Sequence, residues 1–516
     1  MDAGISETLP VATIVDQLGL SGNPFEHYTA ETEPHITEYA VRPPYLEAIA
    51  ARVIGLSSFI LFGDRGAGKS ATRITVFNQV WAPEQNTERP LVANLTDFSA
   101  ILPALKRGAL ADKDLVEAAA FVVVEQVLLW LSALDDGQQE TILGRLDADQ
   151  KRLAHVLVTE FYLSRPEFER QFRTQQAFTI LRSALTARGA AWVSQRWDAV
   201  AAVVASIAAT LSKKVVDDNG LGQATEGLLK SLRGDQPHVG RAVLMRLVSF
   251  AQSFGFTGVS ILIDKVDETD LTTNSAESTT KLIYPLLSHI QLLEVTGFSW
   301  QFFLWGKVKS FFGEDAYHVR LDKIANSSIS WDGNSFRNML DARLKYFSRE
   351  RYDFSSMFVD PGVAQNAFEQ INEIAMGSPR ELVKIMDVII REHDAVNAAN
   401  RSTLLDEGSV NAGLDKYVRD VINTVFNEKS LGQIYRLKSI KFINKDVQGA
   451  FRVGDQSARA KIKAWEDAGL VKFIGTRAAE GDFGGKPANE YMIADARIER
   501  IMARNLVKVE ELDEGD

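Results

Sequence analysis

Short apolar runs rich in β-forming residues recur at four places along the chain, and they predict buried strands. These runs alternate with segments whose apolar residues recur every three or four positions, which is the helical period. A strand, helix, strand order of this kind predicts a parallel sheet of at least four strands. The predicted strands are residues 56–62, 90–95, 259–263 and 300–304.

Long helical stretches separate and follow these strands. Residues 102–254 keep the helical period with few strand signals, which predicts a large helical insertion. Beyond residue 331 the pattern predicts amphipathic helices over 335–347, 363–375 and 379–393, typical of a helical lid.

The last ninety residues change character again. The pattern predicts helices near Ile434 and Asn444 and over residues 456–468, followed by strands at 470–474 and 490–493. A Gly-rich turn, residues 481–485, separates the two strands. This order predicts a winged helix-turn-helix.

The composition is that of an ordinary globular protein, with 516 residues, 46% of them hydrophobic and 24% charged. Cysteine is absent, which excludes disulfides, thiolate zinc sites and a cysteine nucleophile and suits a reducing compartment. Because the first residues carry acidic side chains and no basic run before an apolar stretch, they do not resemble a secretory signal. We therefore expect a cytoplasmic location.

Two apolar runs are candidate membrane spans by composition. Residues 199–212 form an uncharged run of 14 residues, whereas a spanning helix needs about 20. The second run, residues 118–134, is interrupted by Glu125 and Gln126. Buried helices of a soluble bundle explain both runs, so we expect no membrane contact.

The net charge of −11 is unevenly distributed. Residues 427–508 hold 16 Lys and Arg against 10 Asp and Glu, and residues 509–516 add five carboxylates. An acidic protein with one basic module is not covered with phosphate-binding surface. Only the C-terminal module is therefore suited to a nucleic acid.

A glycine-rich motif follows the first predicted strand and opens a helix. It matches the phosphate-binding pattern GxxxxGK[ST], in which backbone N–H groups and a helix N-terminus surround a polyanion. Lys69 would reach the β- and γ-phosphates of ATP, and the Ser70 hydroxyl would bind Mg²⁺. The alternative is a turn that is merely rich in glycine. The predicted nucleotide-binding residues are Gly63, Asp64, Arg65, Gly66, Ala67, Gly68, Lys69, Ser70 and Ala71.

Carboxylates follow the third predicted strand. A P-loop needs an acidic residue at the carboxyl end of a neighbouring strand to hold the metal, and Asp264 takes that place. Asp267 or Glu268 is the candidate to orient the attacking water. Alternatively, Asp267 and Glu268 only cap the next helix.

The motifs at residues 63–70 and 261–268 together resemble the AAA+/STAND group of P-loop NTPases. STAND proteins carry an Asp-x-x-Asp-Glu pattern at the second motif, which Asp264, Asp267 and Glu268 match here, whereas many AAA+ enzymes have an adjacent Asp-Glu. Lys265 occupies the position that is usually glutamate. The lysine in place of glutamate implies slow ATP hydrolysis, and it favours a slow conformational switch over an enzyme that hydrolyses ATP rapidly.

Other segments resemble origin-recognition-type initiator ATPases. Gly377-Ser378-Pro379-Arg380 resembles their sensor-2 motif, which implies that Arg380 contacts the γ-phosphate from the lid; a solvated arginine at a helix start is the alternative. Arg343 resembles an arginine of the initiator lid that acts between subunits, though an exposed helical arginine is an equal reading. Residues 23–25, with Glu31 and Glu33 following, look like the segment that leads into such a core. Where a polar sensor 1 belongs, Trp305-Gly306-Lys307 stands instead.

We therefore expect an α/β fold, a P-loop NTPase parallel sheet with a large helical insertion, a helical lid and a C-terminal winged helix. The expected parts are a lead-in segment (1–50), an ATPase core (51–101 and 255–330), the insertion (102–254), the lid (331–426), the winged helix (427–508) and an acidic tail (509–516).

The second helix of a winged helix-turn-helix enters the major groove of DNA, and the wing touches phosphate. Winged helices also serve as packing modules, so an internal or protein-binding role stays open. The candidate nucleic-acid residues are Arg459, Lys461, Lys463, Arg477 and Lys486.

The leading hypothesis is an ATP-dependent switch that oligomerises with ATP and acts on duplex DNA or an effector protein, in replication, mobile-element maintenance or antiviral defence. The rival is a non-DNA signalling switch whose insertion docks a protein partner. A third hypothesis, a helical scaffold with an incidental glycine motif, predicts no role for Lys69 in ATP binding.

Overall fold

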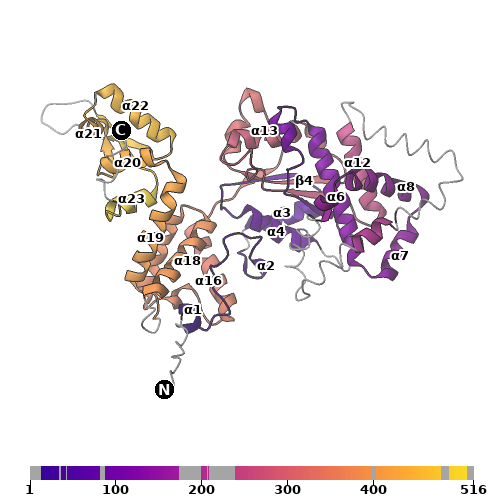
Figure 1. Ribbon diagram of the computed structural model, residues 1–516, viewed down its shortest axis with the longest axis horizontal. Helices are drawn as coiled ribbons and strands as arrows, with labels where there is room; N and C mark the ends of the chain where they lie inside the picture. The colour runs from indigo at the N-terminus through magenta and orange to yellow at the C-terminus, as the bar shows by residue number, and fades with distance from the viewer. Residues whose placement is uncertain are drawn as a thin grey trace, which may run out of the picture. The chain divides into compact units, whose positions relative to one another are not determined.

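The computed structural model describes residues 13–33, 36–41, 44–81, 88–171, 173, 199–205, 207, 239–396, 403–477 and 487–507. The chain forms two compact units (Figure 1). One unit is Thr29–Trp331 and holds a parallel sheet, and the other joins Met1–Tyr28 to Asp332–Asp516 and is mainly helical.

The sheet has five strands in the order β2-β3-β4-β1-β5, and every pairing in it is parallel. All carboxyl ends therefore lie along one edge, which is the edge where open α/β sheets bind ligands. The strands are β1 (Phe59–Gly63), β2 (Leu91–Leu95), β3 (Val259–Ile263), β4 (Phe298–Trp305) and β5 (Asn326–Ser328).

The predicted α/β fold with a parallel sheet is confirmed. Every residue of β1, β3 and β4 is buried, as expected for strands covered on both faces, and this is why they read as continuous apolar runs. The fifth strand, β5, was missed. Its three residues, Asn-Ser-Ser, lie at an edge of the sheet and are only partly buried, so they carry no apolar signal.

One expectation about strand order was wrong. The strand that bears Asp264 was expected to neighbour the P-loop strand, but β4 lies between β1 and β3. The backbone register pairs Gly63 of β1 with Trp305 of β4, while Ile263 of β3 pairs with Phe302. The end of β4 therefore stands beside the start of the P-loop.

Helices cover the sheet and share one hydrophobic core with it. In this core α4 contacts β1 and β4, α6 contacts β2 and β3, and α12 contacts β3 and β4. Figure 1 shows α3 and α4 close together below β4. The α-helices of this unit are α2 (Ile36–Tyr39), α3 (Pro44–Ile54), α4 (Lys69–Val80), α5 (Leu102–Lys106), α6 (Asp112–Ala133), α7 (Asp136–Arg145), α8 (Ala148–Leu157), α12 (Val239–Ser253), α13 (Ala276–Leu287), α14 (Ile290–Leu293) and α15 (Val308–Phe311).

Three short helical segments of other types complete the described helices of both units: the π-helix η1 (Val158–Leu163) and the 3₁₀ helices η3 (Asp315–Tyr317) and η4 (Phe354–Met357). Among the described residues, α6 alone is long and apolar enough to cross a membrane by length and composition. In the structure 94% of its apolar window is buried, so packing against the sheet accounts for its composition.

The second unit begins with a helical part. Asp332 caps α16 and Asp360 caps α17 by accepting hydrogen bonds from first-turn N–H groups, which fixes where both helices start. The helices are α1 (Ile14–Gln17), α16 (Gly333–Ser348), α17 (Pro361–Ala375), α18 (Pro379–Val396) and α19 (Glu407–Val425).

A small antiparallel sheet with strand order β6-β8-β7 follows. Helices precede and interleave with it in the order expected of a winged helix, and this part of the predicted fold is confirmed. The elements are α20 (Glu428–Arg436), β6 (Lys441–Ile443), α21 (Asn444–Phe451), α22 (Asp455–Asp467), β7 (Val471–Arg477), β8 (Ala488–Ile493) and α23 (Ala496–Ala503).

Helices α18 and α19 run side by side (Figure 1), and a glycine sets how close they come. A Cβ atom at Gly413 of α19 would lie 2.5 Å from the Cα atom of Ile389 on α18. No real Cβ contact is that short, so any side chain at this position must push the helices apart.

Gly413→Ala should lower the free energy of unfolding by about 1–3 kcal/mol, because it overpacks the contact between α18 and α19. Gly449→Ala in α21 is the matched control, since a Cβ there meets no atom within 4 Å. Alanine also favours a helix interior by roughly 0.5–1 kcal/mol over glycine. Urea unfolding of both variants checks the expectation, and equal shifts would contradict it.

Candidate nucleotide site

The loop between β1 and α4 depends on its glycines. Gly66 and Gly68 have φ angles of 78° and 91°, in the left-handed region that glycine adopts without strain. At Gly63 a Cβ would lie 3.2 Å from Ile329 and 3.3 Å from the Cγ atom of Lys69. The motif therefore forms a tight turn that brings backbone close to the start of α4.

The N-terminus of α4 is suited to an anion. Gly68 at the N-cap offers no side-chain hydrogen bond, and the first turn holds no acidic residue. The first N–H groups of a helix lack intrahelical acceptors and carry the positive end of the helix dipole. A phosphate group placed there would supply the missing acceptors. Ser70 and Ala71 lie in this turn and are partly exposed.

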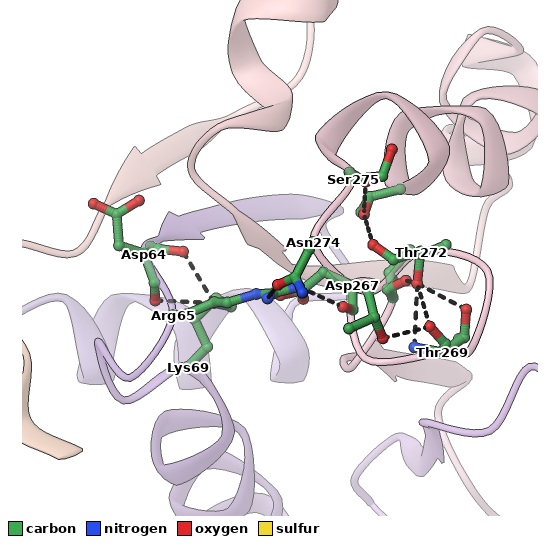
Figure 2. A network of polar contacts seen from close by, with 12 residues as sticks. Asp64, Arg65, Lys69, Asp267, Thr269, Thr272, Asn274 and Ser275 are labelled. Carbon is green, nitrogen blue, oxygen red and sulfur yellow. Dashed lines mark hydrogen bonds and ion pairs between the residues drawn. The ribbon is translucent and has the colours of Figure 1, made fainter. Parts of the chain in front are cut away.

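The Lys69 side chain lies inside this loop, with 8% of its surface exposed. Its Nζ donates hydrogen bonds to the carbonyl oxygens of Gly63 at 2.9 Å and of Asp64 at 3.1 Å. Figure 2 shows Lys69 beside Asp64 and Arg65. These two hydrogen bonds hold the positively charged ammonium group inside the loop, at the place where a phosphate would bind.

Burial lowers the pKa of Lys69, because the charged form loses its hydration. The negative charges of Asp267, Asp264, Glu268 and Asp64 oppose that effect and raise the pKa. The fold thus brings the predicted metal and water-orienting carboxylates within electrostatic range of the predicted phosphate-binding lysine.

Asp264 directly follows β3 and is 1% exposed. Its Oδ2 accepts a hydrogen bond from Nε of Arg73 on α4 at 3.0 Å. Sequence reasoning did not single out Arg73. An arginine four positions after the P-loop lysine, in a helix expected to pack on the sheet, was the signal available.

The P-loop holds Asp267 through Arg65. The Nε atom of Arg65 lies 3.0 Å from Oδ2 of Asp267, and Nη2 donates to the Asp267 carbonyl at 2.7 Å. A third bond runs from Nη1 to Oδ1 of Asn274 at 2.6 Å. Figure 2 shows Arg65 pointing into the loop that carries these residues. Arg65 therefore clamps the loop after β3 to the P-loop.

The clamped loop also has internal bonds. The Thr272 hydroxyl donates to the carbonyl of Val266 at 2.7 Å and accepts from the Thr269 N–H at 3.1 Å, as Figure 2 shows in part. Asp267 in this loop is 3% exposed, whereas Glu268 is exposed. The two candidate water-orienting carboxylates thus stand in different surroundings.

Trp305 ends β4 where a polar sensor was expected. The Arg65 guanidinium lies 4.5 Å from the centre of its ring, and the Lys307 ammonium lies 5.4 Å from it. Next to it, the Gly306 N–H donates to the Gly63 carbonyl at 3.0 Å. The tip of β4 is therefore hydrogen-bonded to the first residue of the P-loop motif.

Trp331 also contacts the P-loop, and sequence reasoning missed it. Its indole Nε1 donates to the carbonyl of Ala67 at 2.8 Å. Trp331 is the last residue of the sheet unit, and the chain enters the helical unit at Asp332.

Two predicted arginines lie in the helical unit. Arg380 is the second residue of α18 and is partly exposed. Arg343 on α16 is 6% exposed, and its Nη1 donates to the Pro24 carbonyl at 2.8 Å, so the reading as an exposed helical arginine was wrong. Their predicted roles at the nucleotide and between subunits stay predictions.

The predicted nucleic-acid residues share α22 and β7, except Lys486, which lies outside the described residues. Arg459 pairs with Asp455 on the same helix at 2.9 Å, and Arg477 pairs with Glu490 on β8. Lys461 lies 4.9 Å from the ring centre of Phe451. Lys463 is exposed and has no ion pair with a described residue.

No group of three or more His, Cys, Asp and Glu side chains within the described part of the chain could hold a metal ion by itself. Mg²⁺ in phosphate sites is bound by one or two carboxylates together with substrate phosphates and water. Ser70 at the start of α4 and Asp264 at the tip of β3 fit that donor set, and their metal role stays a prediction.

No protein-family model matches the chain, and no curated protein does. Among solved structures, the chain is similar to one described as Drosophila ORC bound to DNA, with 11% identity, a TM-score of 0.33 and coverage of 98% of this chain and 94% of the other. It is also similar to Cdc6p from Pyrobaculum aerophilum, with 10% identity, a TM-score of 0.32 and coverage of 92% and 96%. Likenesses this distant carry no inference about ligands or partners.

Replacing Lys69 by alanine should weaken ATP binding. Losing charge-assisted hydrogen bonds to phosphate corresponds to about a 10- to 100-fold rise in Kd. Isothermal titration calorimetry with ATP and Mg²⁺ measures the change. Lys281→Ala is the control, because Lys281 is an exposed lysine on α13 of the same unit whose ion pair is with Glu277. Equal affinity of Lys69→Ala and wild type would make the glycine motif incidental.

Proposed function

We propose that this chain is an AAA+-type P-loop ATPase that uses ATP binding to switch its conformation or assembly. The observation that carries the proposal is the buried ammonium of Lys69, set at the uncapped N-terminus of α4 and within range of four carboxylates. A buried ammonium beside helix amides that no side chain caps is suited to a triphosphate.

Each residue has a distinct role in this proposal. Lys69 and the amides of residues 63–71 bind the phosphates, and Ser70 and Asp264 hold Mg²⁺. When bound, Mg²⁺ neutralises charge that develops on the phosphate oxygens. Asp267 or Glu268 accepts a proton from the attacking water or orients it.

Two features support slow hydrolysis. Asp267 is ion-paired with Arg65 through its Oδ2 atom, so this oxygen must leave the guanidinium before it can orient a water molecule. Lys265 stands in the position where the resembled group carries glutamate, so no carboxylate is supplied there. A long-lived ATP state suits a switch better than a motor.

Asp267→Asn should leave ATP affinity nearly unchanged and lower the turnover rate on the order of 100-fold, if Asp267 is the group that handles the proton of water. Glu268→Gln is the comparison, because it removes the neighbouring charge on an exposed side chain. Phosphate release under single-turnover conditions measures the rate. A larger loss in Glu268→Gln would move the assignment to Glu268, and no loss in either would exclude both.

We further propose that ATP promotes a homo-oligomer and that Arg380 reports on the γ-phosphate from the lid. The fork of an arginine can hold a phosphate bidentately, and partial exposure leaves Arg380 available for this. Arg343 can act between subunits only after leaving its bond to Pro24.

Duplex DNA is the partner we propose for the winged helix. The basic excess of residues 427–508 and the exposed Lys463 on α22 support it. By analogy alone, the setting is replication, mobile-element maintenance or antiviral defence in the cytoplasm.

Arg459→Ala combined with Lys463→Ala should weaken duplex DNA binding and make it less sensitive to salt. Each lost phosphate contact lowers the slope of log K against log salt by about 0.9. Fluorescence anisotropy over a range of salt concentrations measures this slope. Lys416→Ala is the control, since Lys416 lies on α19 outside the winged helix and pairs with Asp420. Identical salt slopes in all three proteins would exclude these DNA contacts.

A protein effector is the second candidate partner, and a specific observation favours it. Phe473 and Ile474 are 53% and 39% exposed on β7, which is an edge strand of the small sheet. In addition, Arg459 and Arg477 already have carboxylate partners. Binding to an effector without any nucleic acid in the preparation would support this candidate over DNA.

A further inference from the structure

A buried arginine stands directly behind the predicted metal carboxylate. Arg73 lies four residues after Lys69, one turn further along α4, and is 1% exposed. Burying a guanidinium costs free energy unless its donors and its charge are matched. The partners of Arg73 therefore show what this position does.

The guanidinium donates in three directions, to three segments of the chain. Nε donates to Oδ2 of Asp264 at 3.0 Å, and Nη1 donates to Oδ1 of Asn94 on β2 at 2.8 Å. Nη2 donates to Oε1 of Glu31, in the segment before α2, at 3.2 Å. Arg73 thus ties the tip of β3 to its neighbouring strand and to the lead-in segment.

Glu31 also holds Lys265. The Nζ atom of Lys265 lies 3.1 Å from the same Oε1 that accepts from Arg73. Lys265 has a φ of 63°, an uncommon conformation for a residue other than glycine. The ion pair with Glu31 explains the position of the Lys265 side chain. Asp264, Arg73, Glu31 and Lys265 form a network with two charges of each sign.

We propose that Arg73 is the positioning residue of Asp264 and that Glu31 sets the charge that Mg²⁺ meets there. This inference rests on the proposed nucleotide function. Arg73 occupies Oδ2 of Asp264, and no described residue hydrogen-bonds Oδ1. Oδ1 is therefore the oxygen left for Mg²⁺ or for water bound to it. Glu31 offsets the charges of Arg73 and Lys265, which would otherwise repel the metal.

A purely structural ion pair and a positioning residue predict different behaviour. A structural pair affects folding and leaves the relation between nucleotide and metal unchanged. A positioning residue changes how much Mg²⁺ strengthens nucleotide binding and leaves metal-free binding nearly the same, because Lys69 and the loop amides remain.

The experiment compares the Kd for ATP with Mg²⁺ to the Kd with EDTA, using calorimetry on the full chain. The ratio of the two values is the Mg²⁺ enhancement. Arg73→Ala should reduce the enhancement about tenfold, which is within the range of coupling between contacting charged groups. Arg73→Lys keeps the positive charge but makes fewer hydrogen bonds, so it should retain part of the Mg²⁺ enhancement that Arg73→Ala loses.

Arg500→Ala is the matched control. Arg500 is also largely buried and bonds to Asp415, Gln370 and Asn411, but it lies on α23 of the helical unit. It should change thermal stability without changing the Mg²⁺ enhancement. A loss of enhancement in Arg500→Ala as large as that in Arg73→Ala would overturn the proposal.

Two further variants test the route. In an Asp264→Asn background, Arg73→Ala should cause no additional loss, because Arg73 acts through Asp264. Glu31→Gln should reduce the enhancement by a smaller factor, because it leaves two cations facing one carboxylate. If Arg73→Ala does not fold, Arg73→Lys and Glu31→Gln provide the test. An Mg²⁺ enhancement equal to that of the wild type in both variants would overturn the proposal.

The outcomes also separate this inference from the proposed function. Absence of ATP binding by the wild type would refute the function together with the inference. ATP binding that Mg²⁺ does not strengthen, or an enhancement that Arg73→Ala leaves intact, would refute the inference alone.

Discussion

The buried ammonium of Lys69 is the interaction on which the site depends. An isolated cation with so little exposure would be unfavourable, and carbonyl oxygens of the P-loop together with four nearby carboxylates stabilise it. Two of these carboxylates are themselves paired, Asp264 with Arg73 and Asp267 with Arg65. Charges at the carboxyl edge of the sheet are therefore mutually dependent. A triphosphate bound at this edge would change the surroundings of all of them at once, which is the physical reasoning behind the proposed switch.

The sheet order decides how these charges meet. Because β4 lies between β1 and β3, Asp264 reaches the P-loop across one intervening strand. That strand ends beside Gly63, to which Gly306 is hydrogen-bonded, and Trp305 lies under the Arg65 guanidinium. The P-loop, the tip of β4 and the loop after β3 consequently form one connected structure, so that a shift in any one of them acts on the other two.

Features carried by local sequence could be predicted, and features that depend on distant partners could not. The P-loop and β3 have strong local patterns, and β3 was predicted at its observed bounds. The polar strand β5 gave no such pattern. Arg65 and Arg73 meet partners about 200 positions away, at separations of 202 and 191 residues, which no local pattern encodes. The position of Arg343 was open to prediction, because it continues the apolar face of α16 formed by Phe336, Met339, Leu340 and Leu344.

The same geometry connects the loop to the rest of the chain. Trp331 donates to the carbonyl of Ala67, in the middle of the P-loop, and is the last residue before the chain passes into the helical unit. Phosphate binding orders the backbone of that loop through its amides, and the carbonyls of the same peptide groups must follow because peptide groups are planar. A change at Ala67 therefore acts directly on Trp331, which stands at one of the two places where the chain passes between the units, the other being between Tyr28 and Thr29. Because Asp332, which caps α16, follows Trp331 directly, the loop contact adjoins the start of the helical unit along the chain.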